Sequence, residues 1–183
     1  MSTLVDFRIT SYAFDYELIE PFNVAQVNPA SYDVRLGSEL LIESINGFSA
    51  IDISDHVYML KPGEFALGVT MEYFKLPTNL EAVFQLKSSR GREGYEHALA
   101  GYIDPGYHGE ITLELSNLNR FHELPLYEGL LIGQIRFLEL SESPRKPYSM
   151  TGHYHKDKGV QKSKVNPYAD WKSNNYYRKT QET

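Results

Sequence analysis

Cysteine is missing from this chain, since none of its 183 residues is a cysteine. Its absence excludes disulfides, iron–sulfur clusters and thiol nucleophiles, and also the cysteine-bearing zinc site of one large class of nucleobase deaminases. Any catalysis must therefore use carboxylates, hydroxyls, histidines or cationic side chains. The only close pair among the six histidines is His153 and His155, and no acidic residue completes a metal-ligand spacing, so we expect no protein-bound metal.

Long hydrophobic runs are missing as well. No apolar stretch approaches the roughly 18 residues that a membrane span requires, and residues 1–9 lack the continuous apolar core of a signal peptide. We therefore expect a cytoplasmic protein without a membrane partner. The length suits one compact domain followed by a tail.

Basic residues are scarce in the first part of the chain, and acidic residues are scarce in the last part. Residues 1–144 hold 9 Lys and Arg against 21 Asp and Glu, whereas residues 145–183 hold 9 against 3. The acidic body disfavours a broad nucleic-acid surface, because phosphate contacts need a basic footprint. The basic, tyrosine-rich tail either straps across the acidic body or binds nucleic acid through its lysines with Tyr176 and Tyr177 stacking on bases. We favour the strap and expect no nucleic-acid partner.

What the chain does contain is period-two alternation, from about residue 31 to 140, which predicts half-buried antiparallel strands. Turn residues separate the runs at positions 61–64, 76–79, 104–106 and 127–129. The pattern predicts an all-β domain over residues 1–144, closed as a barrel or a double sheet. Short helices are expected only within residues 11–19 and 88–93. The alternating apolar residues are Phe65, Leu67, Val69 and Met71; Leu80, Ala82, Phe84 and Leu86; and Ile111, Leu113 and Leu115.

Three segments have side chains suited to chemistry. Residues 87–92 (KSSRGR) follow a predicted strand and are either a phosphate-binding turn or an ordinary exposed turn. Glu110, Thr112 and Glu114 share the polar face of their strand, and that face meets either solvent or a pocket, where a buried carboxylate could act as a general acid/base. Residues 100–109 form either a plain loop or a wall for a flat ring, with Asp104 at its lip.

Several motifs occur in the order typical of one known family. They are residues 29–37 (PASYDVRLG), 62–67 (PGEFAL), Leu76-Pro77, Ser88-Ser89 with Arg92, residues 103–109 (IDPGYHG), Leu113-Glu114 and residues 129–134 (GLLIGQ). Together they cover about residues 19–140. The chain therefore resembles the dCTP deaminase branch of the dUTPase-like superfamily.

The resemblance implies an all-β, dUTPase-like fold that assembles as a homotrimer with active sites between subunits. It implies hydrolytic deamination of dCTP to dUTP and ammonia without zinc, in pyrimidine deoxynucleotide metabolism, with Mg²⁺ arriving on the phosphates and deoxynucleotides such as dCTP, dUTP and dTTP as ligands. By position, Glu114 is the general acid/base, and Ser88 and Arg92 orient the water and the carboxylate. The nucleotide-binding positions carried over are Lys87, Ser89, Arg90, Gly91, Asp104, Thr112, Leu113, Tyr148, Tyr154 and Lys158.

The chain also departs from the family pattern. Lys87 stands where the family usually has Arg, which keeps the charge but loses the planar fork, and Arg90 stands where an aliphatic residue is common. His153 and Asp157 occupy the places of a usual Lys and a usual Gln, and Lys158 is a candidate substitute. An aspartate near a triphosphate repels it, so these departures leave a non-catalytic trimer that binds deoxynucleotides as an alternative.

The residues before Ile103-Asp104 bear on the product. Gly101 and Tyr102 are more similar to bifunctional members, which also cleave dUTP to dUMP and pyrophosphate, and to dUTPases, whose corresponding acid activates the attacking water. The glycine-rich C-terminal arm typical of dUTPases is missing. We therefore predict a deaminase that forms dUTP, with a bifunctional dCTP deaminase and dUTP diphosphatase, or a dUTPase-like hydrolase, as the alternative.

Overall fold

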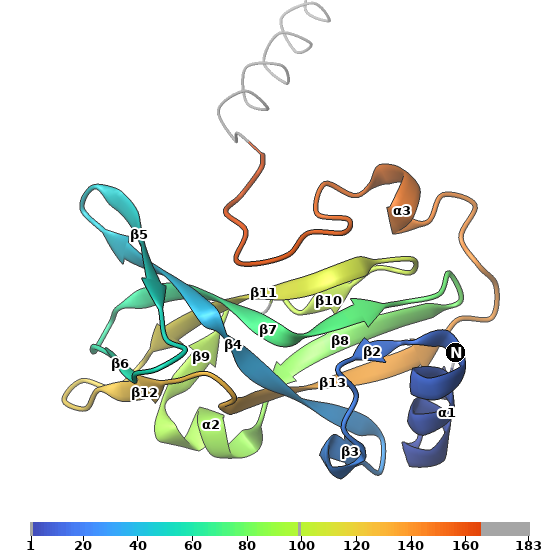
Figure 1. Cartoon of the computed structure of the whole chain (residues 1–183), viewed down its shortest axis with the longest axis horizontal. Helices are drawn as coiled ribbons and strands as arrows, with labels where there is room; N and C mark the ends of the chain where they lie inside the picture. The colour runs from blue at the N-terminus through green and yellow to red at the C-terminus, as the bar shows by residue number, and fades with distance from the viewer. Residues whose placement is uncertain (1, 99, 166–183) are drawn as a thin grey trace, which may run out of the picture.

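The computed structural model describes residues 2–98 and 100–165 of the chain. It is mostly β, with few short helices (Figure 1). In chain order the elements are β1 (Ser2–Thr3), α1 (Asp6–Tyr16), β2 (Ile19–Glu20), the 3₁₀ turn η1 (Val24–Gln26), β3 (Val27–Asn28), β4 (Ser31–Ser44), β5 (Gly47–Asp52), β6 (Tyr58–Leu60), β7 (Phe65–Lys75), β8 (Leu80–Leu86), α2 (Ser88–Glu93), β9 (Tyr95–His97), β10 (Tyr102–Ile103), β11 (His108–Asn117), β12 (Leu124–Leu126), β13 (Leu131–Glu139) and α3 (Tyr148–Thr151).

One antiparallel sheet contains most of the strands, in the order β10-β8-β13-β4-β7-β11-β9. The long strand β4 joins its two parts, because its first residues pair with β13 and its later residues pair with β7 and β5. The sheet curls so that β8, next to one end of this order, approaches β9 at the other end: the ring centroids of Phe84 on β8 and His97 on β9 lie 4.7 Å apart. This curl confirms the predicted all-β, barrel-like fold.

The core follows the predicted alternation in two of the three runs. Leu80, Ala82 and Phe84 on β8 are buried, as are Leu113 and Leu115 on β11. The remaining run differs, because the face of β7 that lies in the core carries Ala66 and Phe74. Phe65 and Leu67 lie on the opposite face and line a pocket instead.

The two predicted helices fare differently. The helical turn expected at residues 88–93 is confirmed as α2. The helix expected within residues 11–19 begins earlier, at Asp6, and ends at Tyr16. Its N-cap, Val5, makes no side-chain capping hydrogen bond, so the sequence carries no capping signal for this start. Within the described ranges, no helix is both long and apolar enough to cross a membrane.

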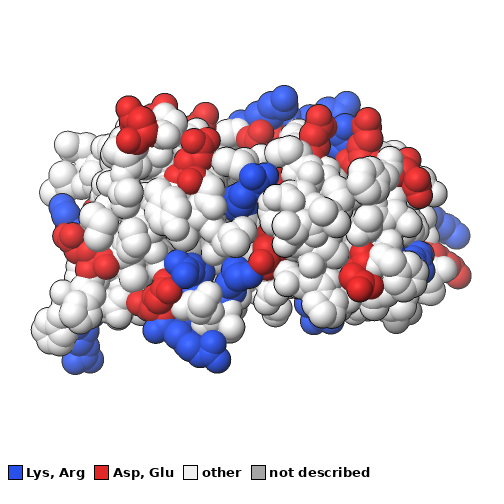
Figure 2. Space-filling view, turned by 60° about the horizontal axis from the view of Figure 1, so that its bottom comes forward, with Lys and Arg blue, Asp and Glu red and all other residues white. Residues whose placement is uncertain are grey.

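The C-terminal segment runs along β11 (Figure 1). The Lys156 amide donates to the His108 carbonyl at 2.6 Å, the Glu110 amide donates to the Asp157 carbonyl at 3.2 Å, and Gly109 and Asp157 form an isolated parallel bridge. The described part of the tail thus lies against β11, and residues 148–164 are called the lid below. Tyr176, Tyr177 and the other residues from 166 onwards lie outside the described residues. Figure 2 shows acidic and basic side chains intermixed on one face of the molecule.

Candidate active site

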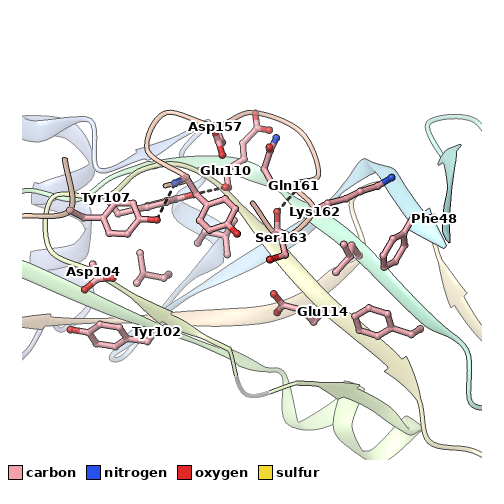
Figure 3. Close-up of a pocket in the computed structure, with 17 residues that line it drawn as sticks. Phe48, Tyr102, Asp104, Tyr107, Glu110, Glu114, Asp157, Gln161, Lys162 and Ser163 are labelled. Carbon is pink, nitrogen blue, oxygen red and sulfur yellow. Dashed lines mark hydrogen bonds between the residues drawn. The ribbon is translucent and has the colours of Figure 1, made fainter. Parts of the chain in front are cut away.

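A pocket of about 450 Å³ lies between β11 and the lid (Figure 3). Its polar face comes from β11, one end comes from the loop before β11, and the other comes from the hairpin of β4 and β5. The described residues that line it are Phe48, Phe65, Leu67, Tyr102, Ile103, Asp104, Tyr107, Glu110, Ile111, Thr112, Glu114, Tyr148, Tyr154, Asp157, Gln161, Lys162 and Ser163.

The polar face of β11 therefore meets a pocket rather than open solvent. Two of its three polar side chains hold the lid: Glu110 Oε2 accepts the Gly159 amide at 2.6 Å, and Thr112 Oγ1 accepts the Gln161 amide at 3.1 Å. These contacts leave Glu114 as the carboxylate on this face that the lid does not engage. The strand thus binds the lid at one end and presents a carboxylate at the other.

Glu114 has one notable neighbour. Its Oε2 lies 3.2 Å from His97 Nε2, and the side chains are 27% and 6% exposed, respectively. Among the described residues this buried oxygen makes no hydrogen bond of good geometry. Unpaired buried acceptors are rare in folded proteins, so this oxygen marks the Glu114–His97 contact as unusual. The motif reasoning did not identify His97, since the residue lies on a separate strand, β9.

Asp104 lies at the far end of the same pocket. The predicted turn at residues 104–106 is present, and Gly106 adopts φ +80°, a value that suits glycine. Burial, and secondly the charge of Glu81, raise the pKa of Asp104. The Tyr102 hydroxyl donates to Glu81 at 2.9 Å, and burial together with this contact raises the pKa of Tyr102 to about 12. Tyr102 and Tyr107 line the pocket together with Asp104. That they form a wall for a flat ring stays a prediction.

The lid closes the pocket with the two predicted tyrosines. Tyr148 stands on α3 with its ring centroid 5.5 Å from that of Tyr107, and its hydroxyl accepts the Tyr154 amide at 3.2 Å. Asp157 also lines the pocket, and its carboxylate forms an ion pair with Lys164. Lys158 does not line the pocket, because its ammonium lies 5.8 Å from the ring centroid of Tyr73.

The positions predicted from residues 87–92 lie elsewhere. None of the described residues that line the pocket comes from Lys87, Ser88, Ser89, Arg90, Gly91 or Arg92. Ser88 and Arg92 contact each other, with Arg92 Nη1 donating to Ser88 Oγ at 3.3 Å, and both are exposed. Leu113 is also outside the pocket, because it is fully buried on the core face of β11. Within one chain, the predicted site residues therefore fall into two groups: those that line the pocket, and those of residues 87–92, which do not.

Several pocket residues escaped the sequence reasoning. Phe65 and Leu67 were expected in the core as part of the 62–67 motif, and they line the pocket instead. Phe48, Gln161, Lys162 and Ser163 belong to no motif that the sequence analysis identified. Glu110 was identified as polar, but its role as the acceptor for the lid was not. In the described part of the chain no group of three or more His, Asp and Glu side chains could hold a metal ion.

Known proteins with similar sequences identify the family of this chain. A family model described as dCTP deaminase-like matches residues 6–140. Over 159 residues the chain is 41% identical to a protein of Dictyoglomus thermophilum and 38% identical to one of Bifidobacterium longum, with 77% of this chain and 81% and 82% of those proteins covered. Both relatives are named "dCTP deaminase, dUMP-forming".

A solved structure, the 2′-deoxycytidine 5′-triphosphate deaminase of Agrobacterium tumefaciens, has the same fold. It is 27% identical, with a TM-score of 0.64, and the match covers 74% of this chain but 48% of that one, so this chain spans about half its length. The relatives' names contradict our prediction of dUTP as the product and agree with the bifunctional alternative. The predicted family is confirmed: the chain belongs to the dCTP deaminase-like hydrolases.

Proposed function

We propose that this protein is a dUMP-forming dCTP deaminase. It converts dCTP and two waters into dUMP, ammonia and pyrophosphate. One observation carries the proposal: a single lidded pocket contains two carboxylates that the lid does not engage, Glu114 and Asp104. Two hydrolyses at opposite ends of one nucleotide need two such groups, each placed to move protons.

Glu114 serves the deamination. Attack at C4 of cytosine requires a water made more nucleophilic, a proton for the ring nitrogen and a proton for the departing amine. A carboxylate can take the water's proton and pass it on in sequence. Glu114 lines the pocket and its side chain is 27% exposed, so a water in the pocket can reach its carboxylate. The products of this step are a uracil ring and ammonia.

Asp104 serves the diphosphatase step. Its carboxylate orients a second water, which attacks the α-phosphorus while the bond to the bridging oxygen of pyrophosphate breaks. The proton of that water passes to Asp104 and then to solvent. The raised pKa of Asp104 fits this task, because a more basic carboxylate is a better proton acceptor.

The phosphates require cations that the pocket does not supply. The described lining contains Asp104, Glu110, Glu114 and Asp157 against one cation, Lys162. We infer that Ser88 and Arg92 of a neighbouring copy complete the site, in a homotrimer. Arg92 can bind two oxygens at once. Mg²⁺ enters with the triphosphate as part of the substrate, where it neutralises part of the phosphate charge.

Product analysis tests the proposal. Purified protein is incubated with dCTP and Mg²⁺, and dUTP, dUMP, ammonia and pyrophosphate are quantified over time. We expect ammonia, pyrophosphate and dUMP in equal amounts. Glu114→Gln should lower ammonia release by about a thousandfold, while calorimetry with dCTP still shows binding. Asp104→Asn should release ammonia and accumulate dUTP.

Matched controls and contrary results are defined by the same assay. Glu43→Gln replaces an exposed glutamate of β4 outside the pocket and should leave both rates unchanged. Accumulation of dUTP by the unaltered protein would contradict the dUMP-forming assignment. Tight dCTP binding without any product would contradict catalysis and favour a non-catalytic nucleotide-binding trimer.

A further inference from the structure

Lys87, the residue directly before α2, already forms an ion pair within its own chain. Its ammonium forms an ion pair with Asp33 Oδ2 on β4, with side chains 28% and 11% exposed, respectively. Strand β13 lies between the two partners, because it pairs with β4 on one side and with β8 on the other. The lysine therefore reaches across a strand to a nearly buried carboxylate.

Asp33 is fixed by its own neighbours. Its Oδ1 accepts Asn28 Nδ2 at 2.8 Å, and its backbone carbonyl accepts Gln26 Nε2 at 2.7 Å. Gln26 Nε2 also donates to the fully buried Glu72, which pairs with Arg35 at 2.8 Å. A network in which each member has a partner is rigid, because moving one group leaves others unpaired in a poorly solvated place. Lys87 is thus attached to a rigid part of the sheet.

The three cations of residues 87–92 differ in what they contact. Lys87 pairs with Asp33, and Arg90 pairs with Glu93 at 2.9 Å while lying 5.8 Å from the ring centroid of Tyr95. Arg92 contacts Ser88 Oγ, and in the described ranges no carboxylate lies within ion-pair distance of it. Of the three, Arg92 is the cation available to an anionic ligand.

We propose that Asp33 is a positioning residue for the reaction. Through Lys87 it fixes the beginning of α2, so that Ser88 and Arg92 present the correct geometry to the nucleotide, and Lys87 itself does not bind phosphate. This inference rests on the proposed function, because it concerns the residues that we assign to the second part of the site. It revises the role that the family resemblance implied for Lys87.

Helix α2 needs such an anchor. It has six residues, and a helix this short is unstable alone, because forming the first turn costs more than its hydrogen bonds return. Its N-cap, Lys87, makes no side-chain capping hydrogen bond. The Lys87 amide donates to the Ile132 carbonyl at 3.2 Å, and the Gly91 amide donates to the Lys87 carbonyl at 3.1 Å. The side-chain ion pair adds a second attachment at the same residue.

A double-mutant cycle tests the anchor. Asp33→Asn, Lys87→Met, the double variant and the conservative Lys87→Arg are compared for kcat and KM with dCTP. We expect each single variant to lower kcat about tenfold or more, because small displacements of positioned groups slow catalysis strongly. The double variant should be no slower than the slower single variant, since both changes break one pair. Lys87→Arg should recover most of kcat, and KM should change little.

A phosphate ligand would behave differently. If Lys87 bound phosphate, Lys87→Met would raise KM, and Asp33→Asn would lower it by freeing the ammonium and removing a repelling charge. That pattern, or additive effects in the double variant, overturns the proposal. Lys75→Met is the matched control: Lys75 also pairs with a carboxylate, that of Glu17, and its side chain is 29% exposed. It should leave kcat unchanged.

Amide hydrogen exchange keeps the anchor testable apart from the enzyme's activity. In the full chain, Asp33→Asn and Lys87→Met should each speed exchange in residues 88–94 by about tenfold, while exchange in β11 stays unchanged. Unchanged exchange in α2 overturns the anchor even in an active enzyme. If the unaltered protein does not turn over dCTP but α2 still loosens in both variants, the proposed function has failed and the anchor has not.

Discussion

The pocket on β11 and the helix α2 are the two parts of the candidate site, and they have opposite character. The carboxylate part consists of Asp104, Glu110 and Glu114 beneath the lid, in an enclosed and acidic pocket. The cationic part consists of residues 87–92, which lie outside that pocket. The first can move protons but repels an anion. The second can bind an anion, because among the described residues no carboxylate lies within ion-pair distance of Arg92 and Glu93 pairs with Arg90.

This difference is the reason why we propose an assembly, rather than a single chain, as the active form. Bringing a triphosphate beside four carboxylates is unfavourable without nearby cations, since like charges a few ångströms apart repel strongly in a poorly solvated site. Within one chain, no described residue of α2 lines the pocket on β11. A symmetric oligomer can place the α2 of one chain at the pocket of the next and repeat this contact around a ring.

The strongest test of this comparison mixes two inactive proteins. Glu114→Gln removes the acid of the carboxylate part and Arg92→Ala removes the free cation of the other. We expect each alone to be nearly inactive, because each lacks one part at all its sites. After joint unfolding and refolding at equal amounts, about a quarter of the sites should combine an intact Glu114 with an intact Arg92 from a neighbour. Ammonia release from dCTP measures the recovery.

Mixing without refolding is the control, since intact oligomers do not exchange chains quickly. Recovered activity near a quarter of the unaltered rate supports sites shared between chains. No recovery, with oligomers shown to be mixed by mass spectrometry, would place both parts of the site in one chain and contradict the comparison.

Most of the fold could be predicted from the sequence, because burial on one side of a strand leaves a period of two. The β8 run shows this clearly, since Leu80, Ala82 and Phe84 lie in the core as expected. On β7 the rule failed, because the core face also holds Thr70 and the fully buried Glu72. Arg35 neutralises the Glu72 carboxylate, and Gln26 donates a hydrogen bond to it. Both partners are distant in sequence, so a local hydropathy pattern cannot predict them.

The candidate site was predictable only in part, because residues distant in sequence also contribute to it. The resemblance identified Glu114, Asp104, Thr112, Tyr148 and Tyr154, and the structure brings these five to one pocket. It also grouped Ser88 and Arg92 with them, although in one chain they lie apart. A motif order shows which residues belong to a site but not which copy of the chain supplies each. Phe48 and Lys162 were missed because only the lid brings them together, with the ammonium 5.6 Å from the ring centroid.

An intermediate effect is expected from the lid's own charge pair. Asp157 faces the pocket, and Lys164 neutralises it. Lys164→Met should raise the KM for dCTP about fivefold, corresponding to roughly 1 kcal/mol for a partly exposed pair, because the aspartate then repels the triphosphate. Asp157→Asn should leave KM unchanged or lower it, and the double variant should return close to the unaltered value. Steady-state kinetics at constant Mg²⁺ gives the comparison.

The contrary pattern is equally clear. If Asp157→Asn raises KM as much as Lys164→Met does, the pair acts only by bracing the lid, and the acidity of the pocket does not limit binding. Met150→Ala serves as the control for a lid change without charge, because Met150 is 70% exposed on α3 and does not line the pocket.

The smallest expected effect is a pH shift at the far end of the carboxylate part. Burial raises the pKa of Asp104 first, and the Glu81 charge raises it further. Asp104 activates water only when ionised. Because its pKa is raised, pyrophosphate release should begin to fall at a higher pH than it would with an ordinary aspartate. Glu81→Gln removes the repelling charge but retains an acceptor for Tyr102, so the acidic limb should move to lower pH while burial keeps it above the ordinary range. Rates of pyrophosphate release from dUTP across the acidic range measure the shift, with the exposed Glu142→Gln as control. An acidic limb that does not move would show that a group other than Asp104 limits this step, and the other carboxylates that line the pocket, Glu110, Glu114 and Asp157, would be the groups to test next.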